Sequence, residues 1–336
     1  MRTAICNGAV PRQSCISTLL VRLFVVLSLW ITTVDARVQT VSLPLTAEKG
    51  DAFTVRVTKR ISETKNGVTS NEGPFSFNYD GEVLDASASG LRIRWMLKSA
   101  FMPASREDNA TLSASTLTLM KDIPLEFDAG PNGAPVRIPN FREILPRLMQ
   151  VARELLTEEG KEPDPQVIER TEAMYKSMSP QTAASSFLPE AILIGSMQNL
   201  RLEPGEAKRS EAMQPNPFGG APIKAVTELR LASHDPVSGF AVLTWQTTFD
   251  PQSIVESTKQ LIQSMRKPGE KELPAEALEM IGKIELARND VGRALVSVRD
   301  GWVRKLHYQQ KITNALMSNT QSKDETWLIE IDRVKR

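Results

Sequence analysis

The stretch that decides the fold is residues 53–61, which read FTVRVTKRI. Apolar and polar residues alternate along most of this stretch, and such a period of two is typical of a β-strand with one buried and one solvated face. Strands of this kind belong to antiparallel sheets, whose neighbours are joined by short turns. The dipeptide Asn66-Gly67 follows and predicts a hairpin turn, because both residues tolerate a positive φ.

The same alternation recurs on the C-terminal side of this hairpin and again in the second half of the chain. The first group of expected strands lies around residues 75–79, 91–95, 116–119, 125–127 and 136–138. The second group is expected at residues 226–231, 240–249, 284–287, 294–298, 303–312 and 326–331. The clearest hairpin turn in the chain is Asp300-Gly301, and we expect the last four strands to form a meander.

Helical periodicity replaces the alternation at Asn140. Apolar residues fall on one face of a helix, namely Phe141, Ile144, Leu145, Leu148, Ala152, Leu155 and Leu156. Asn140 and Glu143 have the spacing of a capping box, whereas Pro146 predicts a kink or a later helix start. Further helices are expected where a capping residue precedes a proline, at Asp164-Pro165, Ser179-Pro180 and Asp250-Pro251. A short helix is also expected at residues 275–281.

These elements predict an α+β fold with a large, mostly antiparallel β-sheet of meanders and hairpins. The inserted amphipathic helices are expected to pack on one face of that sheet. Residues 204–222 are rich in Pro, Gly and charge and are interpreted as a long loop. We expect residues 37–336 to form a single domain, and a weak similarity between residues 37–200 and 201–336 leaves an internal duplication open.

Residues 1–36 have the layout of a cleaved secretory signal peptide. An uncharged run at residues 23–34 follows Arg2, Arg12 and Arg22, and Ala36 stands at the expected cleavage site. The alternative is a retained transmembrane anchor, although twelve residues are short for about 30 Å of hydrocarbon. We therefore expect a periplasmic or secreted protein with no stable membrane span after cleavage.

Composition narrows the chemistry of the mature chain. Both cysteines, Cys6 and Cys15, lie before the cleavage site, so the mature chain would have no disulfide, thiolate nucleophile or Cys-zinc site. An exported chain without cysteine favours a bacterial envelope. The 41 basic and 40 acidic residues nearly balance, which argues against nucleic-acid binding.

The sequence contains no convincing catalytic motif. His234 and His307 do not have the spacing of a metal site, and Ser62 with Lys65 matches a Ser-x-x-Lys motif that lacks its partner motifs and its helix. Glycine-rich phosphate loops are absent from the sequence. We expect no cofactor and no metal, and favour a non-enzymatic protein over a hydrolase without a recognisable motif.

The remaining hypothesis concerns the space between the sheet and the helices. Tryptophans fall on or beside expected strands and methionines on expected helices, so a packed core and a ligand cavity are both compatible with the pattern. The candidate residues for an apolar pocket are Trp95, Trp245, Trp302, Leu148, Met149, Met174, Met178 and Met265. The preferred function is an envelope protein that binds an apolar or lipid-like ligand; the alternative is an envelope scaffold with a solid core and a protein partner.

Overall fold

The computed structural model describes residues 40–101, 120–121, 123–157, 164–214, 221–264, 285–316 and 319–334. The chain divides into two units, Met1–Gln39 and Thr40–Arg336, and all described residues lie in the second. The expected signal peptide, both cysteines, the expected strand at residues 116–119, Met265 and the expected helix at residues 275–281 lie outside the described residues.

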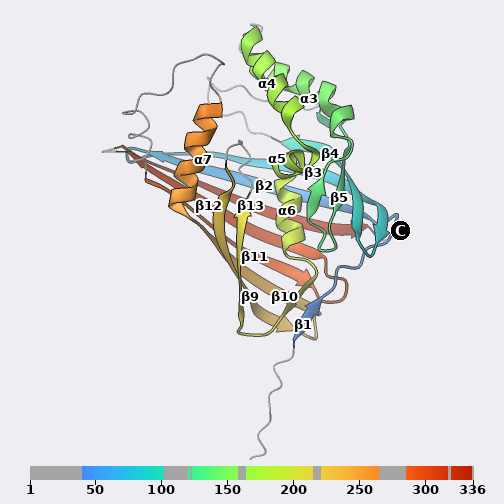
Figure 1. The fold of residues 1–336 in the computed structure, drawn as a ribbon. Helices are drawn as coiled ribbons and strands as arrows, with labels where there is room; N and C mark the ends of the chain where they lie inside the picture. The colour runs from blue at the N-terminus through green and yellow to red at the C-terminus, as the bar shows by residue number, and fades with distance from the viewer. Residues whose placement is uncertain are drawn as a thin grey trace, which may run out of the picture. The chain divides into compact units, whose positions relative to one another are not determined.

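A large antiparallel sheet of eleven strands dominates the unit Thr40–Arg336 (Figure 1). Its strands are β2 (Ala52–Lys65), β3 (Val68–Ser87), β4 (Gly90–Phe101), β5 (Leu125–Ala129), β6 (Pro135–Arg137), β8 (Ala207–Gln214), β9 (Ile223–Asp235), β10 (Phe240–Phe249), β11 (Glu285–Ser297), β12 (Val303–Leu316) and β13 (Asn319–Val334). They lie in the order β6-β5-β4-β3-β2-β13-β12-β11-β10-β9-β8. The first long strand therefore pairs with the last one, and Ala52 lies opposite Val334.

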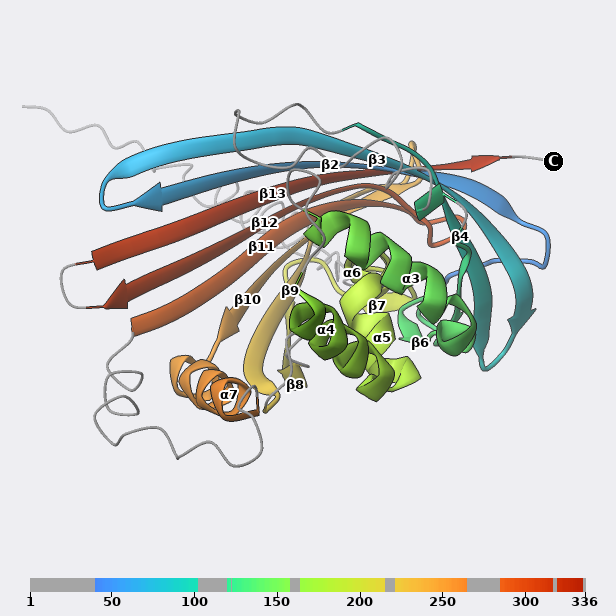
Figure 2. The same ribbon diagram turned by 90° about the horizontal axis from the view of Figure 1, so that it is seen from above.

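The helices lie within the curve of this sheet (Figure 2). Four of them follow one another after β6, namely α3 (Phe141–Leu156), α4 (Pro165–Ser177), α5 (Pro180–Phe187) and α6 (Pro189–Ser196). The helix α7 (Pro251–Ser264) contacts β9 and β11. A separate two-stranded sheet pairs β1 (Val41–Leu43) with β7 (Leu200–Leu202). The predicted α+β fold, with a large antiparallel sheet and helices on one face, is confirmed.

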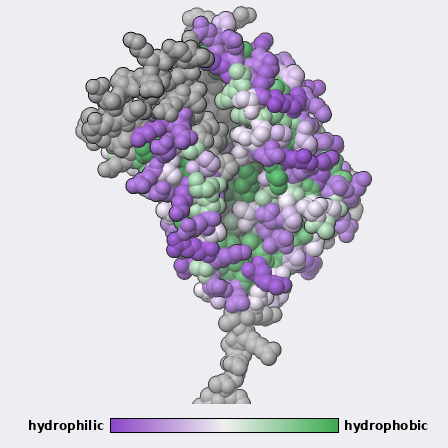
Figure 3. Space-filling model, viewed as in Figure 1, coloured by the Kyte–Doolittle hydropathy of each residue, from purple (hydrophilic) through white to green (hydrophobic). Residues whose placement is uncertain are grey.

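The core lies between the concave face of the sheet and the helices. In the stretch that opened the sequence analysis, Val55 and Val57 are buried, whereas Arg56 between them is exposed. The same alternation makes Ile329 and Ile331 of β13 part of the core. On the face drawn in Figure 3, hydrophilic side chains predominate and hydrophobic ones gather near the middle. The curved sheet thus encloses its apolar residues together with one face of the helices.

Local signals predicted the turns and most helix starts correctly. Asn66 and Gly67 have φ values of 50° and 81°, as the hairpin turn requires. The side chains of Asp164, Ser179 and Asp250 accept hydrogen bonds from backbone amides in the first turns of α4, α5 and α7.

The predicted capping box at Asn140 is wrong. The Asn140 side chain makes no capping bond; its Nδ2 donates to the Pro124 carbonyl at 2.9 Å, and its Oδ1 accepts from the Glu126 amide at 3.3 Å. Asn140 thus ties the start of α3 to the start of β5. The helix begins at Phe141, upstream of Pro146.

Two strand predictions also differ from the structure. Residues 204–222 contain β8, which was expected to be loop: each of its residues is exposed, so no alternation revealed it. It forms because β9 offers a free edge for backbone pairing. The two strands expected at residues 284–287 and 294–298 are one continuous strand, β11, whose central residues include polar Arg288 and Asp290.

Candidate ligand cavity

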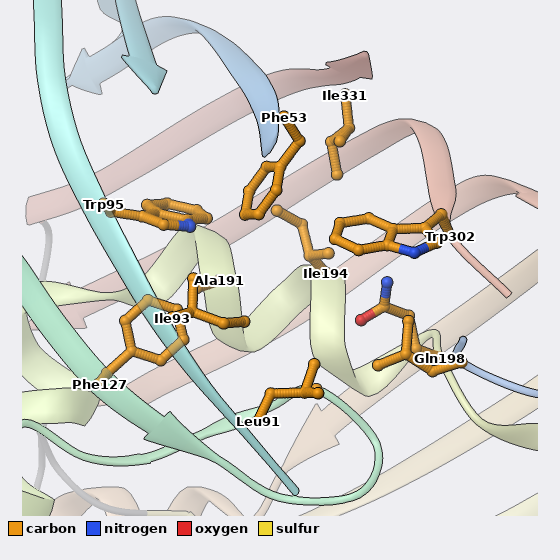
Figure 4. Close-up of a pocket in the computed structure, with 12 residues that line it drawn as sticks. Phe53, Leu91, Ile93, Trp95, Phe127, Ala191, Ile194, Gln198, Trp302 and Ile331 are labelled. Carbon is orange, nitrogen blue, oxygen red and sulfur yellow. The ribbon is translucent and has the colours of Figure 1, made fainter. Parts of the chain in front are cut away.

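The space between the sheet and α6 is nearly filled. A cavity of only about 30 Å³ lies there, close to the size that holds one water molecule. Figure 4 shows Phe53, Trp302 and Ile194 meeting around it. The Phe53 and Trp302 rings pack at 5.0 Å, and Trp302 Nε1 donates to the Thr46 carbonyl at 2.8 Å. This part of the interface is a packed core.

A much larger cavity lies next to it, between β3 and β4 and the helices α3–α6. Its volume is about 430 Å³, within the range of about 300–1,000 Å³ that is typical of small-molecule sites. Most side chains along its wall are aliphatic or aromatic. Trp95 contributes to both cavities and therefore stands at the boundary between the filled and the open part of the layer.

The helix α3 supplies one wall because of the spacing of its apolar residues. Leu148, Val151 and Ala152 lie three and four positions apart and face the cavity, as does Leu156 one turn later. The opposite wall is the sheet, where Trp95 and Leu97 alternate with exposed Met96 on β4 and so point to the same side.

Two aromatic residues on the shorter helices form part of the cavity wall. Tyr175 of α4 and Phe187 of α5 pack with their ring centroids 5.8 Å apart, and Phe141 of α3 lies 5.8 Å from Phe187 on another side. Both Tyr175 and Phe187 line the cavity. The helix α4 has no buried residue, so its attachment depends on few contacts of this kind.

The cavity has few polar groups, and one of them is a buried carboxylate. Glu190, in the first turn of α6, lines the cavity with a side chain that is only 9% exposed. Its Oε1 lies 3.2 Å from the Nζ of Lys59, which in turn lies 3.7 Å above the Trp327 ring. Tyr79 also lines the cavity; burial, and secondarily the charge of Glu190, raises the pKa of Tyr79 well above its usual value.

The structure places the candidate pocket residues in different environments. Trp95 and Leu148 line the large cavity, and Trp302 lines the small one. Four others line neither of these two spaces: Trp245, Met149, Met174 and Met178. Met149 is buried, Met178 packs against the core and Met174 is 46% exposed.

Trp245 instead covers the backbone of the neighbouring strand. It lies opposite Gly292 of β11, where a Cβ atom would overlap the indole ring. An isolated glycine within a strand often marks such a close approach.

Sequence reasoning missed Tyr79, Phe187, Tyr175 and Glu190 as cavity residues. One available signal was the position of Glu190, an acidic residue within the apolar run that starts at Phe187 and ends at Ile194. A charged residue in such a run is seldom fully buried without a partner. Its partner, Lys59, lies 131 positions earlier in the chain, so no local pattern revealed the pair.

Among the other buried polar groups in the described ranges, Asp290 is satisfied within the sheet, whereas Trp95 Nε1, Asn314 Oδ1 and Asp324 Oδ1 have no hydrogen-bond partner. Asp290 accepts hydrogen bonds from Arg288 and from the Tyr308 hydroxyl, both at 2.7 Å, which is sufficient to explain its burial. Ser62 and Lys65 lie on β2 rather than on a helix. Among residues with a described placement, no group of His, Cys, Asp and Glu is arranged to hold a metal ion. None of the described helices is both long and apolar enough to cross a membrane.

The sequence matches no protein family and no curated protein. Among solved structures, one titled for lipid–protein interactions in lipovitellin is similar to it with a TM-score of 0.45 and 8% identity, over 86% of this chain and 26% of that one. The chain thus spans about a quarter of that protein's length. The outer membrane protein OprG from Pseudomonas aeruginosa gives a TM-score of 0.13 and 6% identity, over 86% and 98% of the two chains. Similarity at this level carries no functional inference.

Proposed function

We propose that this protein binds an apolar or lipid-like small molecule, without chemical conversion, in the cavity between the sheet and the helices α3–α6. The cavity of about 430 Å³ carries the proposal. Its aliphatic and aromatic wall would bury the apolar surface of such a ligand, at about 25 cal/mol for each Å² removed from water. A ligand that filled the space would also restore the dispersion contacts that the lining side chains lack.

The cellular context belongs to the same proposal. A binding protein that is exported to a bacterial envelope fits the signal-like segment at residues 1–36 and the cysteine-free remainder of the chain. A cavity protein in that compartment would keep an apolar molecule out of water between its source and its destination.

A scaffold with a solid core explains the structure less well. The filled region beneath α6 agrees with such a core, but the cavity beside it does not. The exposed edge strand β8 carries Lys208, Arg209 and Glu211, and charged side chains of this kind disfavour pairing with another chain. Ligand binding is therefore the function that the geometry supports best.

The experiment is a titration of the purified full chain with a neutral, apolar fluorescent dye. Ala152 lines the cavity, and Ala152→Phe adds a ring to it; we expect this variant to lose dye binding. Ala212→Phe adds the same ring to an exposed position on β8 and should bind as the parent does. Equal binding by all three proteins, or no binding by the parent, would overturn the proposal.

A further inference from the structure

Two polar groups on the cavity wall have complementary hydrogen-bonding roles. Glu190 presents a carboxylate, which accepts hydrogen bonds, and Tyr79 presents a hydroxyl, which can donate one. Each comes from a different layer, Glu190 from α6 and Tyr79 from β3. Lys59, the partner of Glu190, lies on β2, and Tyr79 of the neighbouring strand β3 lies opposite Val55, four residues from Lys59 and on the same face of the sheet.

Glu190 is a carboxylate whose charge is already balanced. Lys59 lies 3.2 Å from its Oε1, but Lys59 is not among the residues that line the cavity. The carboxylate of Glu190 is therefore part of the described cavity lining, whereas the ammonium group of Lys59 is not. The pair as a whole offers no net charge to a ligand, although the lone pairs of the carboxylate are available to a donor.

Tyr79 keeps its proton and has no hydrogen-bonding partner within the described ranges. Burial raises the pKa of Tyr79 further above its ordinary value of 10.0, so its hydroxyl stays protonated and can donate. A hydroxyl that faces an apolar space without a partner is unfavourable, and a ligand that accepted its hydrogen bond would remove that cost.

The other hydroxyls on the wall differ from Tyr79. Thr171 donates its proton to the Val167 carbonyl at 2.8 Å, within its own helix. The pKa of Tyr175 is raised by burial alone, with no contribution from Glu190. Among the described hydroxyls of the wall, Tyr79 lies on β3, the strand next to that of Lys59, whereas Thr171 and Tyr175 lie on α4.

We infer that the ligand is a neutral amphiphile whose hydroxyl group lies between Tyr79 and Glu190 while its apolar body fills the remaining cavity. An alcohol accepts a hydrogen bond from one side and donates one to the other, which matches this donor and acceptor. The inference rests on the proposed function, because it names the class of ligand for the same cavity.

Charged head groups fit this site poorly. A carboxylate would face the carboxylate of Glu190, and no Lys or Arg is among the described residues of the wall. An ammonium group would have to lose its hydration, and the neutral Lys59–Glu190 pair would not repay that cost. The preference for a neutral head therefore follows from the placement of Lys59 outside the described cavity lining.

The experiment compares decane, decanol, decanoate and decylammonium as competitors of the neutral dye on the full chain. We expect decanol to bind about tenfold more tightly than each of the other three, since two net hydrogen bonds amount to about that factor. Tyr79→Phe should weaken decanol binding about threefold to tenfold and leave decane binding unchanged. Tyr175→Phe, the matched control at the same cavity, should leave the preference intact.

The outcomes separate this inference from the proposed function. If decane and decanol bind equally to the parent, or if Tyr175→Phe removes the preference as strongly as Tyr79→Phe, the hydroxyl site is wrong although the cavity binds. Tighter binding of decanoate or decylammonium would likewise overturn it. If none of the four competes, the proposed function itself fails. Glu190→Gln, which keeps an acceptor oxygen, gives a second variant: it should retain the preference for decanol over decane, and equal binding of these two by the variant would contradict hydrogen bonding at this residue.

Discussion

Lys59 Nζ and Glu190 Oε1 lie 3.2 Å apart, with only 20% and 9% of their side chains exposed. The pair joins the concave face of β2 to the first turn of α6, next to the Trp327 ring that lies beneath the ammonium group. It therefore fixes the helix to the sheet at the boundary of the cavity. A buried ion pair of this kind adds little net stability compared with apolar residues of similar volume, but the loss of one partner is costly.

Removing one partner of this pair should be costly. Lys59→Met leaves the Glu190 carboxylate buried and uncompensated, and we expect the free energy of unfolding to fall by about 3–5 kcal/mol. The double variant Lys59→Met/Glu190→Leu removes both charges and should recover most of that loss. Denaturant unfolding of the parent, the single variant and the double variant measures these differences in the free energy of unfolding.

An exposed pair at the same distance provides the control. Lys98 Nζ lies 3.2 Å from Asp80 Oδ2, but these side chains are 66% and 41% exposed. Lys98→Met should cost less than about 1 kcal/mol, because water already screens the pair. Equal losses for Lys59→Met and Lys98→Met would show that burial of the first pair has no energetic consequence.

A second ionic cluster near the ends of the sheet should make stability depend on pH. Asp300 Oδ2 lies 2.7 Å from Arg304 and 3.2 Å from Arg333, and Arg333 also reaches Asp51 at 2.7 Å. Burial opposes the ionisation of Asp300, but hydrogen bonds, led by that of Ser297, and the two arginines outweigh it. The pKa of Asp300 therefore lies below its ordinary value of 3.8.

The sign of the effect follows from this lowered pKa. The contribution of Asp300 to stability is fully present above the pKa of the unfolded chain and disappears as the pH falls through the lower pKa of the folded state. At about pH 7, Asp300→Asn should lower the free energy of unfolding by about 1–3 kcal/mol. Urea unfolding should show this difference unchanged down to about pH 5 and shrinking below about pH 4.

Asp332, an exposed residue on β13, serves as the comparison. Asp332→Asn should change the free energy of unfolding by less than about 0.5 kcal/mol at every pH of the same series. If the Asp300→Asn difference grew on acidification instead of shrinking, the assigned direction of the pKa shift would be refuted.

The contact between Trp245 and Gly292 gives a prediction about packing. Gly292→Ala places a Cβ atom where the indole lies, and the variant should lose about 1–3 kcal/mol of stability. Gly292→Ala/Trp245→Leu makes room for the methyl group, so it should be more stable than the sum of the two single effects predicts. Additive losses in thermal or denaturant unfolding would show that the two residues do not compete for this space.

Local chemistry was sufficient to predict the parts of the fold that short stretches of chain determine. The alternation at residues 53–61 became the central part of β2, and Asp164, Ser179 and Asp250 cap helices as their sequence context indicated. The sequence pattern did not predict the structure correctly where contacts with residues far along the chain determine it. The strand β8 owes its existence to the free edge of β9, and Asn140 bonds to the start of β5 rather than to its own helix.

The cavity could be anticipated as a layer but not as a set of residues. Apolar positions on β4 and α3 indicated which faces would meet, and Trp95 and Leu148 do line the cavity. Periodicity does not reveal how well two faces fit, so it could not distinguish the filled space beneath α6 from the open one beside it. Glu190 was missed because its role depends on Lys59 and Tyr79, which lie on two different strands.

The most direct test of the central claim is a crystal structure of the full chain grown with decanol. The account predicts electron density for one decanol molecule in the cavity, with its chain between Leu148 and Trp95 and its oxygen within hydrogen-bonding distance of Tyr79 and Glu190. A cavity closed by the surrounding side chains, or occupied by water alone at saturating decanol, would contradict it.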